Sequence, residues 1–163
     1  LEPDQIEGVT LRASAAYGYG LAALRPGPAG DPEDLELLAE AWRARRPSLS
    51  GVTVERGRGR AGGLLSGDAT IHDELAGIVY ELGPESFFQV NADQAARLIE
   101  LVLADLEPHP GQQLLDLYAG VGTFALPLAA AGATVVAVEE HPSAVADGER
   151  SAALNEIGGV RFL

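Results

Sequence analysis

A glycine-rich turn, with an acid some twenty residues further on, has the residue types and spacing of a nucleotide-cofactor site. In "DLYAGVGTF" (116–124) an apolar run ends at Asp116, Tyr118 follows, and Gly120 and Gly122 stand one residue apart. Glycine removes side chains where a ligand approaches the backbone, and a strand, a glycine turn and a helix in this order are typical of nucleotide sites. Glu139 ends the next apolar run, where a carboxylate can accept hydrogen bonds from ribose hydroxyls. This pattern fits NAD and S-adenosylmethionine (SAM) alike.

Three details favour SAM. The third glycine of the dinucleotide pattern is replaced by Ala125, which is an allowed substitute and so weighs only slightly against NAD. Asp116 would repel a pyrophosphate but suits the cationic amino-acid end of SAM. Tyr118 and Phe124 offer aromatic surface to an adenosyl or sulfonium group. The alternative is a loop of a parallel sheet that binds nothing, in which Asp116 only caps a turn.

A cluster of arginines in the first half of the chain is a candidate nucleic-acid contact. Six arginines lie within eighteen residues and are opposed only by Glu55, which gives a local excess of five positive charges. The alternative is a helix C-terminus complemented by cations and followed by a solvated turn. The cluster consists of Arg43, Arg45, Arg46, Arg56, Arg58 and Arg60.

Composition narrows the class of protein. The 163 residues carry a formal net charge of −13 and contain no cysteine, which excludes disulfides, thiolate metal sites and a cysteine nucleophile among them. No apolar run is long enough to span a membrane and no signal peptide is visible, so we expect a cytoplasmic protein. The absence of methionine, even at position 1, and an end at an apparent strand suggest part of a longer chain. His72, His109 and His141 lack metal-ligand spacing and are interpreted as incidental surface residues, so no metal site is expected.

The elements that must position these residues divide the chain in two. Residues 1–84 are predicted to form a small α+β domain whose helix opens at Asp31 and Pro32, an N-cap followed by proline at the first helical position. Residues 57–63, rich in glycine, are predicted to be a flexible turn. The strands predicted in this half are 8–14, 20–25, 51–56 and 76–82.

Residues 85–163 alternate strands and helices, which is typical of a parallel sheet covered by helices. The first predicted helix carries an apolar stripe of Leu98, Val102 and Leu106, which Ile99 and Leu101 widen. The fold class predicted is therefore α/β, the first half of a Rossmann-like class I SAM methyltransferase sheet preceded by a small central domain. The predicted helices are 92–106, 124–131 and 141–156, and the predicted strands are 113–118, 134–139 and 160–163.

Three motifs together resemble the 5-methyluridine RNA methyltransferase family, which methylates C5 of uridine in tRNA or rRNA with SAM. They are "SFFQVN" (86–91), "LLDLYAGVGTFALPLA" (114–129) and "VVAVEEHPSAVADGERSAALN" (135–155). The resemblance implies that Gln89, Tyr118 and Thr123 contact SAM and that Glu139 binds its ribose. It also implies that residues 1–84 help to position RNA. With the residues argued above, the expected cofactor site is Gln89, Asp116, Tyr118, Gly120, Gly122, Thr123 and Glu139.

The resemblance also implies catalytic groups that this chain does not contain. The family uses a cysteine thiolate that adds to C6 of uracil and a glutamate that removes the C5 proton. Both are expected beyond residue 163, so we expect these residues alone to be inactive and to bind SAM weakly if at all. The alternatives are a class I SAM methyltransferase with another substrate and a non-catalytic RNA-binding module, with an NAD enzyme less favoured.

Overall fold

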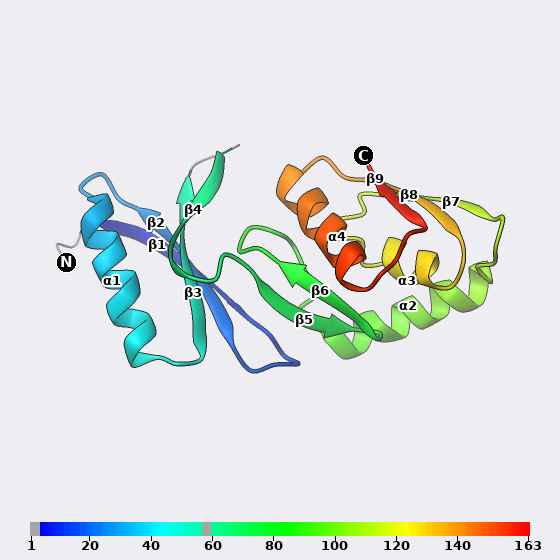
Figure 1. Ribbon diagram of the computed structural model, residues 1–163, viewed down its shortest axis with the longest axis horizontal. Coiled ribbons are helices and arrows are strands. Elements are labelled where there is room, and N and C mark those ends of the chain that lie inside the picture. Colours follow the sequence, from blue (N-terminus) through cyan, green and yellow to red (C-terminus); the bar gives the residue numbers. More distant parts are fainter. Residues whose placement is uncertain (1–3, 57–59) are drawn as a thin grey trace. The chain divides into compact units, whose positions relative to one another are not determined.

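A computed structural model describes residues 4–56 and 60–163 and divides the chain into two compact units, Leu1–Ile71 and His72–Leu163 (Figure 1). The predicted boundary at residue 84 lies thirteen residues further along the chain than this division. The difference arises because β6 (Ile78–Leu82) packs against a helix of the second unit. The segment predicted to close the first domain therefore belongs to the second unit.

The first unit is a four-stranded mixed sheet with one helix. The strand order is β1-β2-β3-β4, with β2 and β3 parallel and the two outer pairs antiparallel. Helix α1 (Pro32–Arg45) makes the crossover between the parallel strands. The predicted turn at 57–63 is replaced from Arg60 onward by β4, and residues 57–59 lie outside the described residues. The strands are β1 (Ile6–Ala13), β2 (Gly20–Pro26), β3 (Leu49–Arg56) and β4 (Arg60–Gly67).

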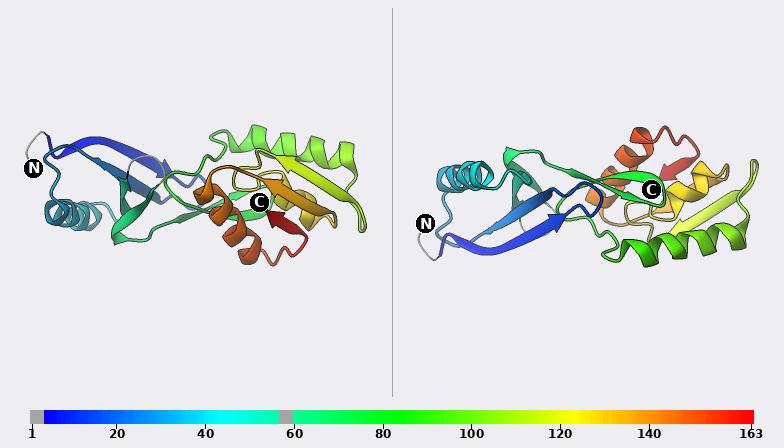
Figure 2. Two further views of the ribbon diagram at one scale, coloured as in Figure 1. Left: turned by 90° about the horizontal axis from the view of Figure 1, so that it is seen from above. Right: turned by 90° about the horizontal axis from the view of Figure 1, so that it is seen from below.

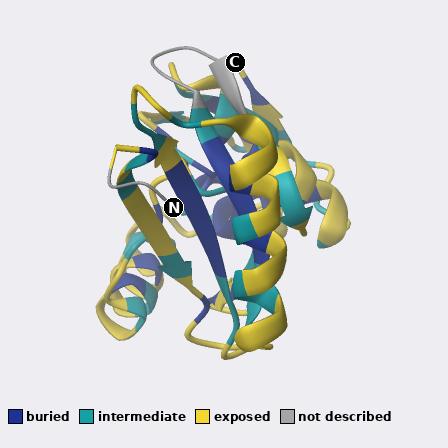
Figure 3. Ribbon diagram, turned by 90° about the vertical axis from the view of Figure 1, so that its left-hand side faces the viewer, coloured by how far each residue is buried: buried dark blue, intermediate teal, exposed yellow. Residues whose placement is uncertain are grey.

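Helix α1 begins where the sequence predicts. The Asp31 carboxylate accepts a hydrogen bond from the Glu33 backbone N–H at 2.9 Å, and Pro32 occupies the first turn. The helix lies on one face of the β1–β4 sheet in both views of Figure 2. Its buried Leu35 and Ala39 pack against buried residues of β2 and β3, while its outer face is exposed (Figure 3). These contacts form the core of the first unit.

The second unit begins with a β-hairpin that the sequence analysis resolved only in part. Strands β5 (Ile71–Leu75) and β6 are joined by Ala76 and Gly77, whose φ angles are 51° and 77°. Two consecutive positive φ values are the signature of a type I′ turn, which matches the twist of a hairpin. The strand predicted over 76–82 therefore starts at Ile78, and the strand before it was not predicted.

The rest of the second unit confirms the predicted alternation of helices and strands. Strands β7, β8 and β9 are parallel and adjacent in that order. Each helix starts and each strand begins within two residues of its predicted position. The elements are α2 (Ala92–Leu106), β7 (Gln113–Leu117), α3 (Ala125–Ala130), β8 (Thr134–Val138), α4 (Pro142–Leu154) and β9 (Val160–Phe162).

The β7–β9 sheet has one covered and one open face. Strand order and sequence order coincide, so right-handed crossovers place α3 and α4 on the same face. On β8, Val135 and Ala137 are fully buried, whereas Leu115 and Leu117 of β7 are 62% and 57% exposed. The helices therefore cover one side of the sheet only.

Helix α2 has the predicted bounds, and burial is confined to one part of the predicted apolar stripe and its flank. Ala95 and Ile99 are buried, while Leu98 and Leu106 of the predicted stripe are 48% and 42% exposed. Apolar residues surround much of this helix, so periodicity alone did not decide which part of the widened stripe is buried. Helix α2 contacts α3 in the folded unit.

A ladder of polar side chains joins α4 to the free edge of β6; we call it the α4–β6 ladder. Its helix members Asp147, Ser151 and Asn155 are four residues apart and face the backbones of Val79, Glu81 and Gly83. Asn155 Oδ1 accepts from Val79 N–H at 3.0 Å and its Nδ2 donates to Val79 C=O at 2.6 Å. Ser151 Oγ accepts from Glu81 N–H at 2.9 Å, and Asp147 Oδ2 accepts from Gly83 N–H at 2.7 Å.

The ladder works because two periodicities match. Four helical residues advance about 6 Å and two strand residues about 6.6 Å. Alternate backbone groups of β6 that do not face β5 therefore meet a polar side chain at every helical turn. Side chains here take the place of a further strand, and they satisfy backbone groups that would otherwise be buried without partners.

We predict that Ser151→Ala destabilises the protein by about 1–3 kcal/mol, because Glu81 N–H loses its acceptor beside a fully buried position of α4. Ser151 is 0% exposed, and its hydroxyl also donates to the Asp147 carbonyl at 2.7 Å. The control is Glu149→Ala on the exposed side of the same helix, expected to change stability by less than about 0.5 kcal/mol. Urea unfolding measures both, and equal effects would contradict the ladder's contribution.

Candidate functional site

A cavity of about 280 Å³ lies in the second unit where three segments meet: the stretch after β6, the loop after β7 and the start of α4. Residues that directly follow β7 and β8 line one side of the cavity. This is expected, because the carboxyl ends of parallel strands lie at the same edge of the sheet. Three of the predicted site residues line it, namely Tyr118, Gly120 and Glu139. The other lining residues are Glu85, Ser86, Phe87, Glu140, His141, Ser143 and Ala144.

Glu139 is held by three hydrogen bonds. Its Oε2 accepts from Gly120 N–H at 2.9 Å, and its Oε1 accepts from the backbone N–H and the ring Nδ1 of His141, each at 2.9 Å. The side chain is only 9% exposed. Burial alone would raise the pKa of Glu139, but these hydrogen bonds and the charge of His141 outweigh it and lower the pKa. The carboxylate is therefore ionised and fixed in place at the mouth of the glycine loop.

His141 is a contact that the sequence analysis misinterpreted. The prediction of an incidental surface residue is right about its exposure, because the side chain is 70% exposed. Its ring and backbone nevertheless both bind Glu139, and it is the N-cap residue of α4. The signal available in the sequence was its place two residues after the strand-ending acid and directly before the helix-starting Pro142.

Asp116 lies half-buried on β7 just before the loop. The Ala125 backbone N–H donates to its carboxylate, while Oδ2 is buried and has no hydrogen-bond partner among the described residues. Burial raises the pKa of Asp116, and the Ala125 hydrogen bond offsets this only in part. An unpartnered buried carboxylate oxygen costs stability, and it fits a ligand that brings a donor or a cation.

The loop after Asp116 is held in an unusual backbone conformation. Tyr118 has φ of 60°, a region that non-glycine residues avoid at a cost of about 1–2 kcal/mol, and its side chain is 89% exposed. Gly120 has φ of 57°, and a Cβ added there would meet nothing within 4 Å. The backbone at Gly120 is therefore open toward the cavity, which the exposed Tyr118 also lines.

Gly122 has a different reason to lack a side chain. A Cβ at this position would lie 2.8 Å from Phe162 Cζ and 3.0 Å from Leu126 Cγ, and φ is 85°. The sequence analysis attributed both glycines to the close approach of a ligand. At Gly122 the neighbour that requires glycine is the protein's own β9, which packs its Phe162 ring against the loop.

Tyr80 on β6 joins two of the sequence motifs, and the sequence analysis did not single it out. Its ring is fully buried, lies 5.0 Å from the Phe88 ring, and its hydroxyl donates to the Thr123 carbonyl at 3.4 Å. Thr123 and the half-buried Gln89 do not line the cavity, and neither do Asp116 and Gly122. The structure thus places the predicted site residues in one unit but brings only three of them to the cavity wall.

The predicted arginine cluster is divided by the structure. Arg43 donates to Ser66 Oγ at 3.0 Å and packs against β4, so it serves the fold. Arg45 and Arg46 are exposed at the end of α1. Arg56 and Arg60 are paired in register at the ends of β3 and β4. Arg58 lies outside the described residues.

No group of three or more His, Cys, Asp or Glu residues in the described part of the chain is placed to hold a metal ion. No helix in the same part is long and apolar enough to cross a membrane.

Comparison with known proteins assigns the family. The family model described as tRNA (Uracil-5-)-methyltransferase matches residues 67–163. The chain belongs to the tRNA (uracil-5-)-methyltransferase family. All seven predicted cofactor residues of this family member fall in the matched region, and the arginine cluster lies before it.

Individual relatives and a solved structure agree with this assignment. The chain is 33% identical over 162 residues to human tRNA (uracil-5-)-methyltransferase homolog A, covering 99% of this chain and 24% of the human protein. It is 32% identical to an uncharacterized RNA methyltransferase of Synechocystis sp., covering 98% of this chain and 36% of that protein. The crystal structure of Pyrococcus abyssi tRNA (uracil-54, C5)-methyltransferase with S-adenosyl-L-homocysteine superposes with a TM-score of 0.68 at 25% identity, covering 94% of this chain and 37% of that one. The chain thus spans less than two fifths of the length of each of these relatives.

We predict that Gly122→Ala destabilises this family member more than Gly120→Ala. Both variants place alanine at a positive φ, which costs about 1 kcal/mol. Only at Gly122 does the added methyl group also collide with Phe162 and Leu126, which adds about 1–3 kcal/mol. Thermal unfolding of the two variants provides the comparison, and equal losses would show that Phe162 yields without cost.

Proposed function

We propose that this chain forms the SAM-binding part of an RNA uracil-C5-methyltransferase. In this proposal β7, β8 and β9 are the first half of a Rossmann-like sheet, and the first unit is the central domain that helps to position RNA. The observation that carries the proposal is the convergence of Glu139, Gly120 and Tyr118 on one cavity at the carboxyl ends of β7 and β8. Family membership supplies the reaction class.

Glu139 is the group proposed to bind the ribose. An ionised carboxylate offers about four lone-pair sites, and three donors already occupy Glu139. Only one lone pair remains free, on Oε2. To accept hydrogen bonds from two ribose hydroxyls, Glu139 must therefore lose one of its three present hydrogen bonds. The exposed His141 ring is the group that can move, whereas the two backbone N–H groups are fixed by the loop and the helix start.

The remaining site residues are proposed to orient the other parts of SAM. Asp116 offers its unpartnered Oδ2 to the cationic amino group, and the exposed Tyr118 ring offers an aromatic face to the adenosyl or sulfonium group. Gln89 and Thr123 are proposed as further contacts on the strength of the family motifs. SAM, when bound, supplies an electrophilic methyl group. The negative charge of the cavity wall, with Glu85, Glu139 and Glu140, suits a cationic cofactor.

These 163 residues do not include the nucleophile that would activate the uracil base for methylation. The chain has no cysteine, so the thiolate that the family resemblance implies is not among its 163 residues. We propose that these residues bind and orient the cofactor but do not by themselves methylate RNA. Either tRNA or rRNA is consistent with the proposal.

Replacing Glu139 by glutamine tests the cofactor site. The variant Glu139→Gln loses the charge and turns one acceptor into a donor, so we expect the SAM dissociation constant to rise about tenfold or more. Glu149→Gln makes the same chemical change on an exposed side chain of α4 that does not line the cavity, and it is expected to change the dissociation constant less than about twofold. Amide NMR titration suits the weak affinity expected. Equal effects of the two variants, or stronger shifts with NAD than with SAM, would contradict the site.

Asp116 and Glu139 predict the direction of a pH effect. Because the pKa of Asp116 is raised and that of Glu139 is lowered, acidification protonates Asp116 first. SAM affinity is therefore expected to fall as the pH drops through the raised pKa of Asp116, while Glu139 is still ionised. In Asp116→Asn this acid-side transition should be absent and the affinity lower at neutral pH. A transition that persists unchanged in that variant would assign it to another group.

A further inference from the structure

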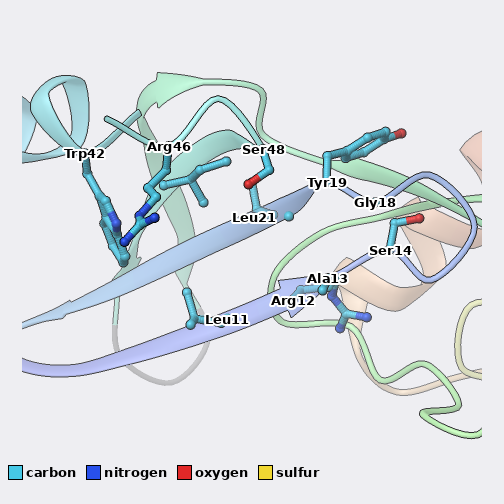
Figure 4. Close-up of a pocket in the computed structure, with 12 residues that line it drawn as sticks. Leu11, Arg12, Ala13, Ser14, Gly18, Tyr19, Leu21, Trp42, Arg46 and Ser48 are labelled. Carbon is cyan, nitrogen blue, oxygen red and sulfur yellow. The ribbon is translucent and has the colours of Figure 1, made fainter. Parts of the chain in front are cut away.

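A second cavity, of about 370 Å³, lies wholly within the first unit, between the end of α1 and the β1–β2 hairpin. The cofactor site does not use it. Figure 4 shows Trp42 and Arg46 extending from the end of α1 toward β1 and β2, with Arg12, Ser14 and Tyr19 nearer the turn of the hairpin. Leu11, Leu21 and Leu49 supply apolar lining.

The lining combines the two side-chain types that hold unpaired nucleotides. Trp42 and Tyr19 are aromatic rings on which a base can stack, and Tyr19 itself stacks on Tyr17 with ring centroids 5.9 Å apart. Arg46 is exposed, and among residues 4–56 and 60–163 its guanidinium makes no ion pair. Arg12 adds a second cation to the wall. Arginine and aromatic rings together bind a phosphate and a base at once.

Charge argues for a nucleic acid rather than a protein segment as the occupant. The chain carries a net charge of −13, so most of its surface repels RNA, and binding must concentrate where arginines gather. A neighbouring cavity of about 370 Å³ is also lined by Trp42, together with Arg45. This second cavity therefore repeats the pairing of an aromatic ring with a cation. Arg45 and Arg46 at the end of α1 therefore line the two cavities that Trp42 also lines.

We infer that this cavity holds an unpaired nucleotide of the substrate RNA, with its base against Trp42 and its phosphate at Arg46. The adjacent nucleotide extends toward Tyr19 and Arg12. Stacking on these rings tolerates any base, so the cavity selects single-stranded over double-stranded RNA rather than one sequence. The inference rests on the proposed function, because it takes RNA as the substrate.

Trp42 is the one tryptophan of the chain, so its fluorescence reports on the cavity directly. A single-stranded oligouridylate titrated into the protein is expected to quench this fluorescence saturably, at the same concentrations at which fluorescence polarisation of a labelled oligonucleotide detects binding. A duplex of equal length is expected to bind at least about fivefold more weakly. RNA binding without quenching, or equal affinity for the duplex, would overturn the inference.

Two matched substitutions sharpen the test. Arg46→Gln is expected to weaken single-strand binding about fivefold and to reduce the salt dependence by about 0.7 in log–log slope, the loss of one phosphate contact. Arg97→Gln removes the same charge from the exposed face of α2 in the other unit, and it is expected to leave both quantities unchanged. Equal effects of the two variants would overturn the inference, because a general charge effect would then explain binding. Tyr19→Leu is expected to weaken binding without changing the salt slope.

The result separates this inference from the proposed function. If SAM binds with Glu139 dependence while oligouridylate leaves Trp42 fluorescence unchanged, the cavity is not an RNA site and the cofactor proposal stands. Quenching by an added peptide but not by RNA would likewise overturn the RNA assignment. If RNA quenches Trp42 but SAM does not bind, the RNA site stands and the cofactor proposal fails.

Discussion

The second unit depends on the way α4 substitutes for a strand beside β6. Hydrogen bonds from Asp147, Ser151 and Asn155 reach backbone groups 64 to 76 residues away in the sequence. Arg150 strengthens the same contact through ion pairs with Asp147 and with Glu81, the latter at 2.7 Å. Because the ladder reaches Gly83, it fixes the point from which the chain enters the segment that lines the cavity.

From that fixed strand a short chain of contacts leads to the cofactor loop. The buried Tyr80 of β6 packs its ring against Phe88 of the "SFFQVN" motif and donates to the carbonyl of Thr123. On the other side of the loop, Phe162 packs where Gly122 leaves room. The loop is thereby held from β6 and β9 at once, which explains how Tyr118 is kept at a positive φ with its ring exposed.

The electrostatics of the site follow from the same positioning. Glu139 receives donors from the loop and from the start of α4, so its charge is stabilised. Asp116 is half-buried and its buried Oδ2 has no partner among the described residues, so its charge is disfavoured in the ligand-free protein. A cationic ligand beside Asp116 would stabilise its ionised carboxylate. The proposed SAM site therefore prefers cationic ligands for an electrostatic reason that does not depend on the shape of the cavity.

The sequence by itself determined the elements from residue 92 onward, the family motifs, and the acids and glycines of the loop. Those features are local, because a helix cap, an apolar strand or a glycine turn is encoded within a few residues. Only the tertiary structure decided that β6 belongs to the second unit, that Gly122 makes room for Phe162, and that His141 binds Glu139. It also decided that, within the wide apolar stripe predicted for α2, Ile99 is buried and Leu98 is exposed. Three of these four depend on contacts between segments distant in the chain. The contact of His141 with Glu139 depends on how a strand end and a helix start are brought together around one carboxylate, which residue spacing alone does not determine.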